Sequence, residues 1–484
     1  MVRRDVNEPR EAFDLVVVGA GVAGWTAARR AQQLRLRVAV LERRPEGPGG
    51  GNGRISGGYL HAAYLDPRRP ALELERAITS ATDGFARPEV ARSWAEHSAA
   101  GMAFLESEGA RFAPLAEPEW LGNVLQPYYD SRPEPGIVER WRGAGPDLLL
   151  TAMWRAFVAA GGDFQPGAPA TDLLVDGGAV TGVAVSGGSG TRRVRGRAVL
   201  LADGGFHSNR ELARTHFGSD RFLLRASGDN QGDCLRMAVA LGAATHELDA
   251  VYAHLHHRDS LHDDRLWPRL SVDLLCEACL VLTAAGRRLG AQDPSFMHLA
   301  HEIIRSESPE GCWLVMDGAA WHGLGRQGEL PPNPTFMELG ARVVEAGRPE
   351  ELAAAIGVRP RRLREEIERF NADAARPAAP PPLAEGVPHP LPARIRFRGS
   401  ATYALPIVVG VTFGMGGVLV DGRAQVLDRE GRPILGLLAA GGVMGGLQGG
   451  RRHGYAGGWS QAVNYGLVAA ERAAELGGTG PARR

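Results

Sequence analysis

A glycine pattern near the start of the chain places the strongest constraint on its fold. Gly19, Gly21 and Gly24 form G-x-G-x-x-G directly after the apolar run 15–18. The residues that follow predict a helix and then a second strand, which ends at Glu42, eighteen residues beyond Gly24. Such glycines permit a tight turn and let a pyrophosphate approach a helix N-terminus, while the carboxylate accepts hydrogen bonds from a ribose. The segment predicts a dinucleotide site rather than a chance glycine turn.

Composition narrows the class of protein. A chain of 484 residues predicts two or three domains. Because 55 Lys and Arg residues balance 55 Asp and Glu residues, there is no overall electrostatic case for binding nucleic acid or an anionic membrane. The start of the chain lacks the apolar stretch of a signal peptide, no run reaches the ~18 apolar residues of a membrane span, and four cysteines favour a reducing compartment. We expect a soluble cytoplasmic protein.

Further along, the chain predicts a meander and two helices. Residues 170–205 show short alternating or β-branched runs between glycine turns, and they end in a buried strand at 198–202. A loop then leads into a helix that begins near Asp233, and a last helix is expected from about Trp459 to Leu476.

These signals divide the chain into an α/β domain and an insertion. Residues 1–244 form the first part of the α/β domain, and residues 396–484 complete it. Residues 245–375 are rich in histidine and acid at their start and then in helix and loop signals, so we expect a second domain there. The prolines of 376–395 predict an extended linker.

Five sequence blocks together resemble a flavoprotein superfamily. They read VVVGAGVAG, GGNGRISGGYLHAA, LLADGGFHSN, GDCLRMAVALGA and GMGGVLVDGRAQVLDREGRPILGLLAAGGVMGG, and they span nearly the whole chain. The chain resembles the FAD-dependent fumarate reductases, succinate dehydrogenase flavoproteins and 3-ketosteroid dehydrogenases, and it looks closest to soluble fumarate reductase and tricarballylate dehydrogenase types. The resemblance implies an α/β, Rossmann-like FAD-binding domain interrupted by an α+β capping domain, with the substrate held between the cap and the flavin.

The resemblance also assigns residues to FAD. It places Gly19, Gly21 and Gly24 at the pyrophosphate and Glu42 at the adenosine ribose. The other positions that it assigns to the cofactor are Ala23, Arg43, Gly51, Asn52, Ser56, Gly57, Gly58, Ala170, Ala202, Gly204, Gly205, Gly441, Gly442 and Gly458.

Two of these positions depart from the pattern of the relatives. Membrane-complex relatives attach FAD through a histidine where this chain has Asn52, so we expect FAD to be bound non-covalently. Most relatives have an acid that meets the ribityl chain where this chain has Gly442.

The polar groups of a fumarate reductase are also missing from their usual places. In those enzymes an arginine of the cap donates a proton, but the matching run 286–302 keeps Arg288, has Gln292 for the acid and offers no arginine in the next twelve residues. Thr412 and Phe413 stand where a histidine of fumarate reductases holds a substrate carboxylate. We do not expect a true fumarate reductase.

Other residues could bind the substrate or move a proton. Arg451, Arg452 and His453 stand where relatives grip a carboxylate or carbonyl, and the planar fork of arginine favours a substrate that bears a carboxylate. We expect one of the two arginines, Arg451 or Arg452, to face solvent. His453 could bind the substrate, act as an acid or base, or only pack on the glycine loop. Tyr403 matches a pocket-lining segment of the relatives.

A cluster of aromatic and histidine residues follows residue 251. If this segment is a strand, Tyr252, His254 and His256 share one face and suit a pocket wall, whereas a solvated turn with ordinary histidines has about equal weight. Cys276 and Cys279 form C-x-x-C, but zinc commonly needs four ligands and the surroundings are apolar. We expect core cysteines and no metal site.

The leading hypothesis is an FAD-dependent oxidoreductase that acts on a CH–CH or C=C bond next to a carbonyl or carboxylate, with hydride transfer at flavin N5. A flavin oxidase or dehydrogenase of a C–N or C–O bond, and a non-catalytic flavin-binding protein, remain alternatives. No second G-x-G-x-x-G follows a strand, so the electron partner, whether O2, a quinone or a protein, stays open.

Overall fold

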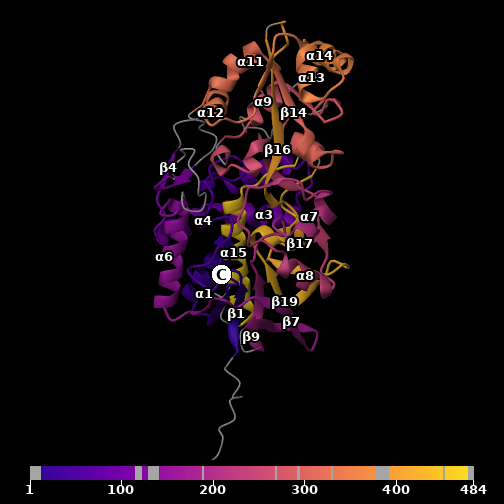
Figure 1. Cartoon of the computed structure of the whole chain (residues 1–484). Coiled ribbons are helices and arrows are strands. Elements are labelled where there is room, and N and C mark those ends of the chain that lie inside the picture. The colour runs from indigo at the N-terminus through magenta and orange to yellow at the C-terminus, as the bar shows by residue number, and fades with distance from the viewer. Residues whose placement is uncertain are drawn as a thin grey trace, which may run out of the picture.

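The computed structural model describes residues 12–114, 123–128, 141–187, 190–267, 270–291, 295–328, 331–375, 392–399, 401–450 and 453–477. Two large sheets organise these residues, one at each end of the molecule (Figure 1).

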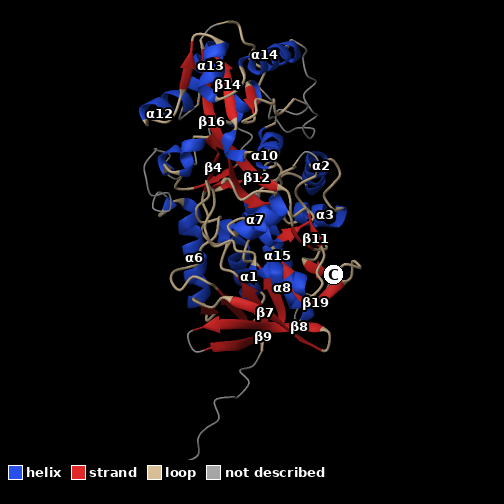
Figure 2. Cartoon of the chain, turned by 45° about the vertical axis from the view of Figure 1, so that its right-hand side comes forward, coloured by secondary structure: helices blue, strands red, loops and turns tan. Residues whose placement is uncertain are grey.

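The first sheet holds eight strands within the described residues, and six of them follow the order β18-β19-β9-β1-β2-β6. Its strands are β1 (Phe13–Val18), β2 (Val38–Leu41), β6 (Asp163–Gln165), β7 (Ala170–Asp176), β8 (Ala179–Gly187), β9 (Gly190–Leu201), β18 (Gln425–Leu427) and β19 (Pro433–Ala439). The pairings β1 with β2, β1 with β9, β2 with β6 and β9 with β19 are parallel. Parallel strands buried on both faces read as continuous apolar runs, which explains Leu15–Val18 and Ala198–Leu201. The expected meander is confirmed as β7, β8 and β9, which Figure 2 shows at the base of the molecule.

Helices cover this sheet and continue toward the cap. They are α1 (Val22–Gln33), α2 (Ala71–Ala81), α3 (Pro88–Glu96), α4 (Ser98–Ser107), α6 (Gly145–Ala159), α7 (Arg210–Phe217), α8 (Asp233–Ala240) and α15 (Gly458–Leu476). The expected helix starts near Asp233 and Trp459 are confirmed by α8 and α15. Helix α15 crosses α1 closely because Gly466 lacks a side chain: a Cβ there would lie 2.9 Å from the Ala23 carbonyl oxygen.

The described residues also form two small three-stranded sheets. Their strands are β3 (Tyr59–Leu60), β4 (Phe112–Pro114), β5 (Asn123–Leu125), β11 (Thr245–His246), β17 (Gly417–Leu419) and β20 (Met444–Gly445).

The second large sheet forms the cap, and its described strands surround β16. The cap comprises β10 (Leu223–Leu224), β12 (Val251–His257), α9 (Asp273–Ala278), β13 (Leu280–Leu282), α10 (Phe296–Ile304), β14 (Trp313–Asp317), α11 (Gly318–His322), α12 (Pro332–Glu338), β15 (Val344–Ala346), α13 (Pro349–Ile356), α14 (Pro360–Ala374) and β16 (Thr402–Gly414). Helices α11 to α14 lie at the end of the molecule opposite β1 and β9 (Figure 1).

The structure refines the expected domain boundary at residue 396. Strand β16 pairs with β10, β12, β14 and β15, so residues 402–414 belong to the sheet of the cap. The chain returns to the first domain only after β16. Of the proline-rich segment, residues 376–391 lie outside the described residues, and residues 392–398 have no regular secondary structure.

Candidate active site between the two sheets

A cavity of about 660 Å³ runs from the carboxyl ends of β1 and β2 to the cap residues of β12 and α9. This volume is in the range of cofactor and ligand sites, which commonly measure about 300–1,000 Å³. The cavity lies at the edge where the parallel strands end, the usual position for ligands in open α/β sheets.

The three glycines of the N-terminal motif have three different roles. Gly19 has a φ of 106°, and a Cβ there would lie 2.5 Å from the Ala202 carbonyl oxygen, so it makes the tight turn. Gly24 lets α1 pack on that turn, because its Cβ would lie 1.9 Å from the Gly19 carbonyl oxygen. Gly21 lines the cavity, where a Cβ would have no neighbour within 4 Å, and it precedes α1 with no side-chain cap. The free N–H groups and the open space suit a pyrophosphate.

Glu42 lies buried at the end of β2, on the cavity wall. Its Oε2 accepts a hydrogen bond from the Ala20 N–H at 3.0 Å, and its Oε1 accepts one from the Arg44 N–H at 2.9 Å. Burial raises the pKa of this carboxyl, and the two N–H donors act against that rise. The carboxylate is thus fixed beside the glycine turn, where it can accept a ribose hydroxyl.

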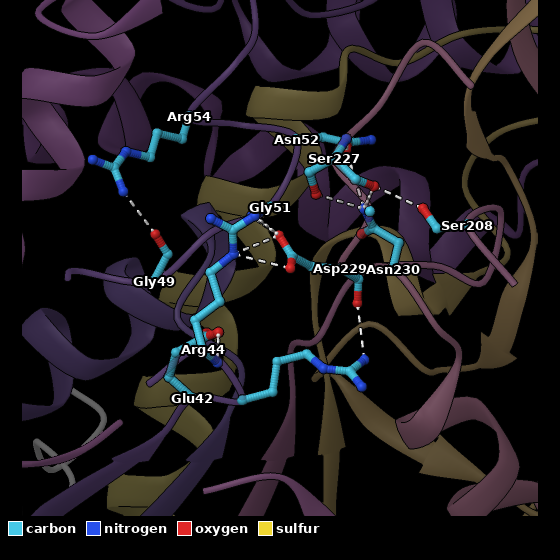
Figure 3. Close-up of polar contacts among 12 residues, drawn as sticks. Glu42, Arg44, Gly49, Gly51, Asn52, Arg54, Ser208, Ser227, Asp229 and Asn230 are labelled. Carbon is cyan, nitrogen blue, oxygen red and sulfur yellow. Dashed lines mark hydrogen bonds and ion pairs between the residues drawn. The ribbon is translucent and has the colours of Figure 1, made fainter. Parts of the chain in front are cut away.

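Polar contacts tie the 49–54 loop to the 225–230 segment (Figure 3). The Arg44 Nε donates to both carboxylate oxygens of Asp229 at 2.9 Å. The Asn52 Oδ1 accepts from the Ser227 N–H at 2.9 Å and from the Asn230 amide at 3.1 Å, while the Asn52 amide donates to the Thr412 carbonyl at 2.6 Å. These hydrogen bonds fix the Asn52 side chain in the cavity wall. Asn52 stands where membrane-complex relatives have the histidine that links FAD covalently.

Asp203 also lines the cavity, and one of its carboxylate oxygens has no hydrogen-bond partner among the described residues. Its Oδ2 accepts from the Cys234 N–H at 2.9 Å, near the start of α8, but its Oδ1 is buried without a partner. Burial raises the pKa of this carboxyl to about 7. Buried polar atoms in folded proteins almost always have a partner, so a hydroxyl or other polar group of a bound cofactor fits here. Together with Gly21 and Glu42, this oxygen makes the cavity suited to a dinucleotide.

The residues expected to contact FAD gather around this cavity, with one exception. Those that line it are Gly19, Gly21, Ala23, Glu42, Arg43, Gly51, Asn52, Ser56, Gly57, Gly58, Ala170, Ala202, Gly204, Gly205, Gly441, Gly442 and Gly458. Gly24 does not line it, because its place in the motif serves the packing of α1. Gly442 lies beside Gly204 and Gly205, where a Cβ would make only ordinary contacts of 3.4–3.6 Å.

At the cap end of the cavity, three polar side chains form a hydrogen-bonded row. The His254 Nδ1 lies 2.6 Å from the Asp273 Oδ2, and the His254 Nε2 lies 3.2 Å from the Tyr252 hydroxyl. A carboxylate only accepts hydrogen bonds, so the His254 Nδ1 carries a proton, and in the neutral imidazole the Nε2 lone pair then faces the hydroxyl. All three residues line the cavity.

Asp273 is partly buried, with 13% of its side chain exposed, and it is held in place from two sides. Its Oδ1 accepts from the Leu255 N–H at 2.7 Å, in addition to the contact with His254. Burial raises the pKa of this carboxyl, but the charge and hydrogen bond of His254 and the Leu255 N–H lower it more, so the net pKa lies below its ordinary value. The carboxylate therefore stays ionised and orients the imidazole.

Aromatic side chains surround the row. The Tyr455 ring stacks on the Tyr252 ring with centroids 4.1 Å apart, and the Phe413 ring stacks on Tyr252 with centroids 5.3 Å apart. The Tyr455 hydroxyl accepts the Gly458 N–H at 2.8 Å, at the first turn of α15. Burial raises the pKa of Tyr455 to about 12 and that of Tyr252 well above its usual value. Both hydroxyls are protonated at neutral pH and can donate.

His453 lines the cavity beside this group. Its ring stacks on that of His301 in α10 with centroids 3.5 Å apart, and its backbone has a φ of 50°. His301 is itself fixed, because it accepts the Val251 N–H at 3.0 Å. His453 thus both packs against the cap and reaches the cavity. Arg451 and Arg452 lie outside the described residues.

Two of the expected substrate residues are not where the sequence pattern suggested. Tyr403 does not line the cavity: its hydroxyl donates to Glu345 at 2.9 Å, and its ring stacks on Trp321. This part of β16 faces the interior of the cap, because the strand is long enough to reach from the cavity into the cap core. His256 shares the face of His254 but is fully buried behind it against Gly410, and burial together with the Arg225 charge lowers its pKa to about 3.

Four residues of the site were not anticipated. Asp203, Arg225, Asp273 and Tyr455 all line the cavity. Tyr455 lies inside the glycine-rich segment 445–461, so its proximity to His453 was a usable signal. Asp273 lies nineteen residues from His254, and no local pattern links the two.

The cysteines are core residues, as expected. Cys276 and Cys279 are buried, and burial raises the pKa of both thiols. Within the described ranges, no group of three or more histidine, cysteine or acidic residues is arranged to hold a metal. In the same part of the chain, no helix has the length and apolar character required to cross a membrane.

Comparisons with known proteins agree with this geometry. A family model described as "FAD binding domain" matches residues 14–457. The chain is 28% identical to a 4-oxocyclohexanecarboxylate 2-dehydrogenase from Sinomonas cyclohexanicum, across 90% of this chain and 88% of that protein. It is 26% identical to a fumarate reductase (cytochrome) from Shewanella frigidimarina, across 97% of this chain and 78% of that protein.

Solved structures share the fold. A 3-ketosteroid delta1-dehydrogenase from Sterolibacterium denitrificans superimposes with a TM-score of 0.72 at 19% identity, covering 96% of this chain and 99% of that one. A flavocytochrome c3 fumarate reductase in an open conformation gives a TM-score of 0.65 at 23% identity, covering 97% and 79%. These solved structures therefore share the overall fold of this chain.

Proposed function

The chain belongs to the FAD binding domain family and is an FAD-dependent oxidoreductase, and on that premise we propose that it moves hydrogen across a CH–CH or C=C bond next to a carbonyl or carboxylate. The observation that carries this proposal is the row Tyr252–His254–Asp273 at the cap end of the cavity. When bound, FAD supplies the hydride chemistry at N5. The chain must supply a proton path and a donor to the developing enolate oxygen.

The cofactor would bind along the part of the cavity that lies at the carboxyl ends of β1 and β2. Gly21 and the start of α1 receive the pyrophosphate, and Glu42 and Asp203 offer carboxylate oxygens to hydroxyl groups. We propose that FAD is bound non-covalently, because Asn52 replaces the linking histidine and its amide is used within the protein. Denaturation in acid should release all of the flavin into the supernatant.

Tyr252 is the group that moves the substrate proton. In the oxidative direction, its oxygen takes a proton from the carbon next to the carbonyl while its own proton passes to the His254 Nε2. Asp273 stabilises the imidazolium that forms, because its carboxylate already accepts the Nδ1–H. In the reductive direction the same protons move back. Burial raises the pKa of Tyr252, but the His254 Nε2 lies within hydrogen-bond distance and can accept the Tyr252 proton.

Tyr455 acts on the carbonyl or carboxylate oxygen of the substrate. Its hydroxyl accepts the Gly458 N–H, so its own proton is free to be donated to a substrate oxygen. A hydrogen bond of this kind strengthens as negative charge develops on that oxygen. Because Tyr455 stacks on Tyr252, the oxygen and the carbon that loses its proton would be held side by side.

The test uses purified protein with FAD, cyclic ketones and keto acids under anaerobic conditions. We expect flavin reduction together with formation of the α,β-unsaturated product, detected by mass spectrometry, and exchange of the substrate α-hydrogen in D2O. The Tyr252→Phe variant should lose about 10²–10⁴-fold in turnover, the usual contribution of a general acid or base. The matched control is Tyr403→Phe, whose hydroxyl lies outside the cavity and whose turnover should change by less than about threefold. Full activity of Tyr252→Phe would exclude the proton path.

A further inference from the structure

Arg225 brings a positive charge to the substrate end of the cavity. It follows β10, and its N–H donates to the Val411 carbonyl at 2.9 Å, which fixes it beside β16. Its side chain lines the cavity and lies beside Gly410, where a Cβ would make only an ordinary contact with the Arg225 Cδ, at 3.5 Å. The same Cβ would lie 2.6 Å from the His256 ring, so the glycine also seats His256 behind the arginine.

The charge of Arg225 is not matched by the protein. Its Nη1 donates to the Thr412 hydroxyl at 3.0 Å, its Nε is buried without a partner, and it forms no ion pair with a carboxylate of the described residues. Arg43 is the other arginine that lines the described cavity, and it pairs with Asp233 at 3.1 Å. A partly buried cation without a counter-charge favours an anion beside it, so Arg225 is suited to bind an anionic group of a molecule in the cavity.

Arg225 shares the cavity end with the proposed reacting residues. Its charge acts to lower the pKa of both Tyr252 and Tyr455, against the larger effect of their burial. Thr412, which orients the guanidinium, is one of the two residues that stand where fumarate reductases have a substrate-holding histidine. An arginine offers a carboxylate two parallel hydrogen bonds and a fixed orientation.

We propose that Arg225 binds a carboxylate group of the substrate, so that the substrate is an organic acid whose oxidisable C–C bond lies next to a carbonyl held by Tyr455. This inference rests on the proposed function for the reaction, but its binding part is independent of turnover. Arg225, rather than Arg451 or Arg452, would then recognise the acid group of the substrate.

The binding experiment compares a carboxylate with its amide. Cyclohexanecarboxylate and cyclohexanecarboxamide, neither of which carries a ketone, are titrated into the FAD-loaded wild type and variants by calorimetry. The wild type should bind the carboxylate about thirtyfold more tightly than the amide, and Arg225→Gln should reduce this preference to less than about threefold without changing the amide affinity. Arg225→Lys should retain part of it. Arg221→Gln is the control, because Arg221 is an exposed arginine four residues away that does not line the cavity.

The kinetic experiment compares 4-oxocyclohexanecarboxylate with its methyl ester. Arg225→Gln should lower kcat/KM about thirtyfold more for the acid than for the ester, and this difference should arise mainly through KM. An equal loss for acid and ester, together with a shifted flavin reduction potential, would show that Arg225 serves the flavin and would overturn the proposal. A wild type without carboxylate preference would overturn it as well. If neither ketone is turned over but the carboxylate preference and its loss in Arg225→Gln are found, the proposed reaction fails and the anion site stands.

Discussion

Replacing Asp273 by asparagine tests the carboxylate that orients His254 in the proposed proton path. The variant keeps the shape of the side chain, and its amide oxygen can still accept the Leu255 N–H that now lies 2.7 Å from Oδ1. Its NH2 group then faces the His254 Nδ1, which must become the acceptor. The imidazole proton moves to Nε2, so that His254 donates to the Tyr252 oxygen and can no longer take its proton.

The size of the effect follows from two losses. The contact between Asp273 and His254, 2.6 Å long, is a charge-assisted hydrogen bond, and such bonds contribute about 1.5–3 kcal/mol, or about 10- to 150-fold in rate at 1.36 kcal/mol per tenfold. The reversed tautomer also removes the proton acceptor, whose general acid–base contribution is about 10²–10⁴-fold. We therefore expect kcat to fall at least about hundredfold, with KM changed by less than about threefold.

The assay separates this mechanism from a general loss of structure. Stopped-flow flavin reduction measures the chemical step, while flavin absorbance and the melting temperature report the integrity of the holoprotein. The double variant Tyr252→Phe/Asp273→Asn should be no slower than Tyr252→Phe alone, because the residues act as a unit. The reasoning is refuted if Asp273→Asn keeps kcat within about threefold of the wild type, or if the two substitutions multiply.

Two further predictions concern Gly21 beside α1 and Glu247 beside Gly450. Gly21→Val should weaken FAD binding at least about tenfold, measured by flavin fluorescence on dilution, because its side chain would enter space that the pyrophosphate needs; unchanged affinity would show that FAD does not approach α1 here. Glu247 accepts the Gly450 N–H with both carboxylate oxygens, and burial raises its pKa from 4.5 to about 7. The folded state therefore binds more protons at this group than the unfolded state, so its contribution to stability falls as pH rises from about 4.5 to 7. Glu247→Gln should remove that fall, and parallel melting-temperature profiles of variant and wild type between pH 5 and 8 would contradict it.

Local sequence signals were sufficient to predict which residues of the N-terminal motif gather at the cavity. Gly19, Gly21 and Glu42 belong to one continuous strand–turn–helix–strand unit, in which spacing along the chain determines spacing in the structure. The roles of the glycines needed the tertiary structure, because the sequence does not distinguish Gly24, which packs against the Gly19 carbonyl, from Gly21, which borders open space. Tyr403 shows the opposite case: a local match to a pocket segment was overruled by the pairing of β16 with β14 and β15.

The sequence by itself determined the fold class, FAD as the cofactor and the class of reaction, since these depend on residues close together in the chain and on blocks that recur in order. Only the tertiary structure decided which polar residues line the cap end of the cavity. Asp273 reaches His254 because α9 packs beside β12, and Arg225 reaches the cavity because β10 adds to β16, more than 180 residues away in the chain. Such contacts come from the packing of separate elements, and no periodicity or spacing in one segment records them.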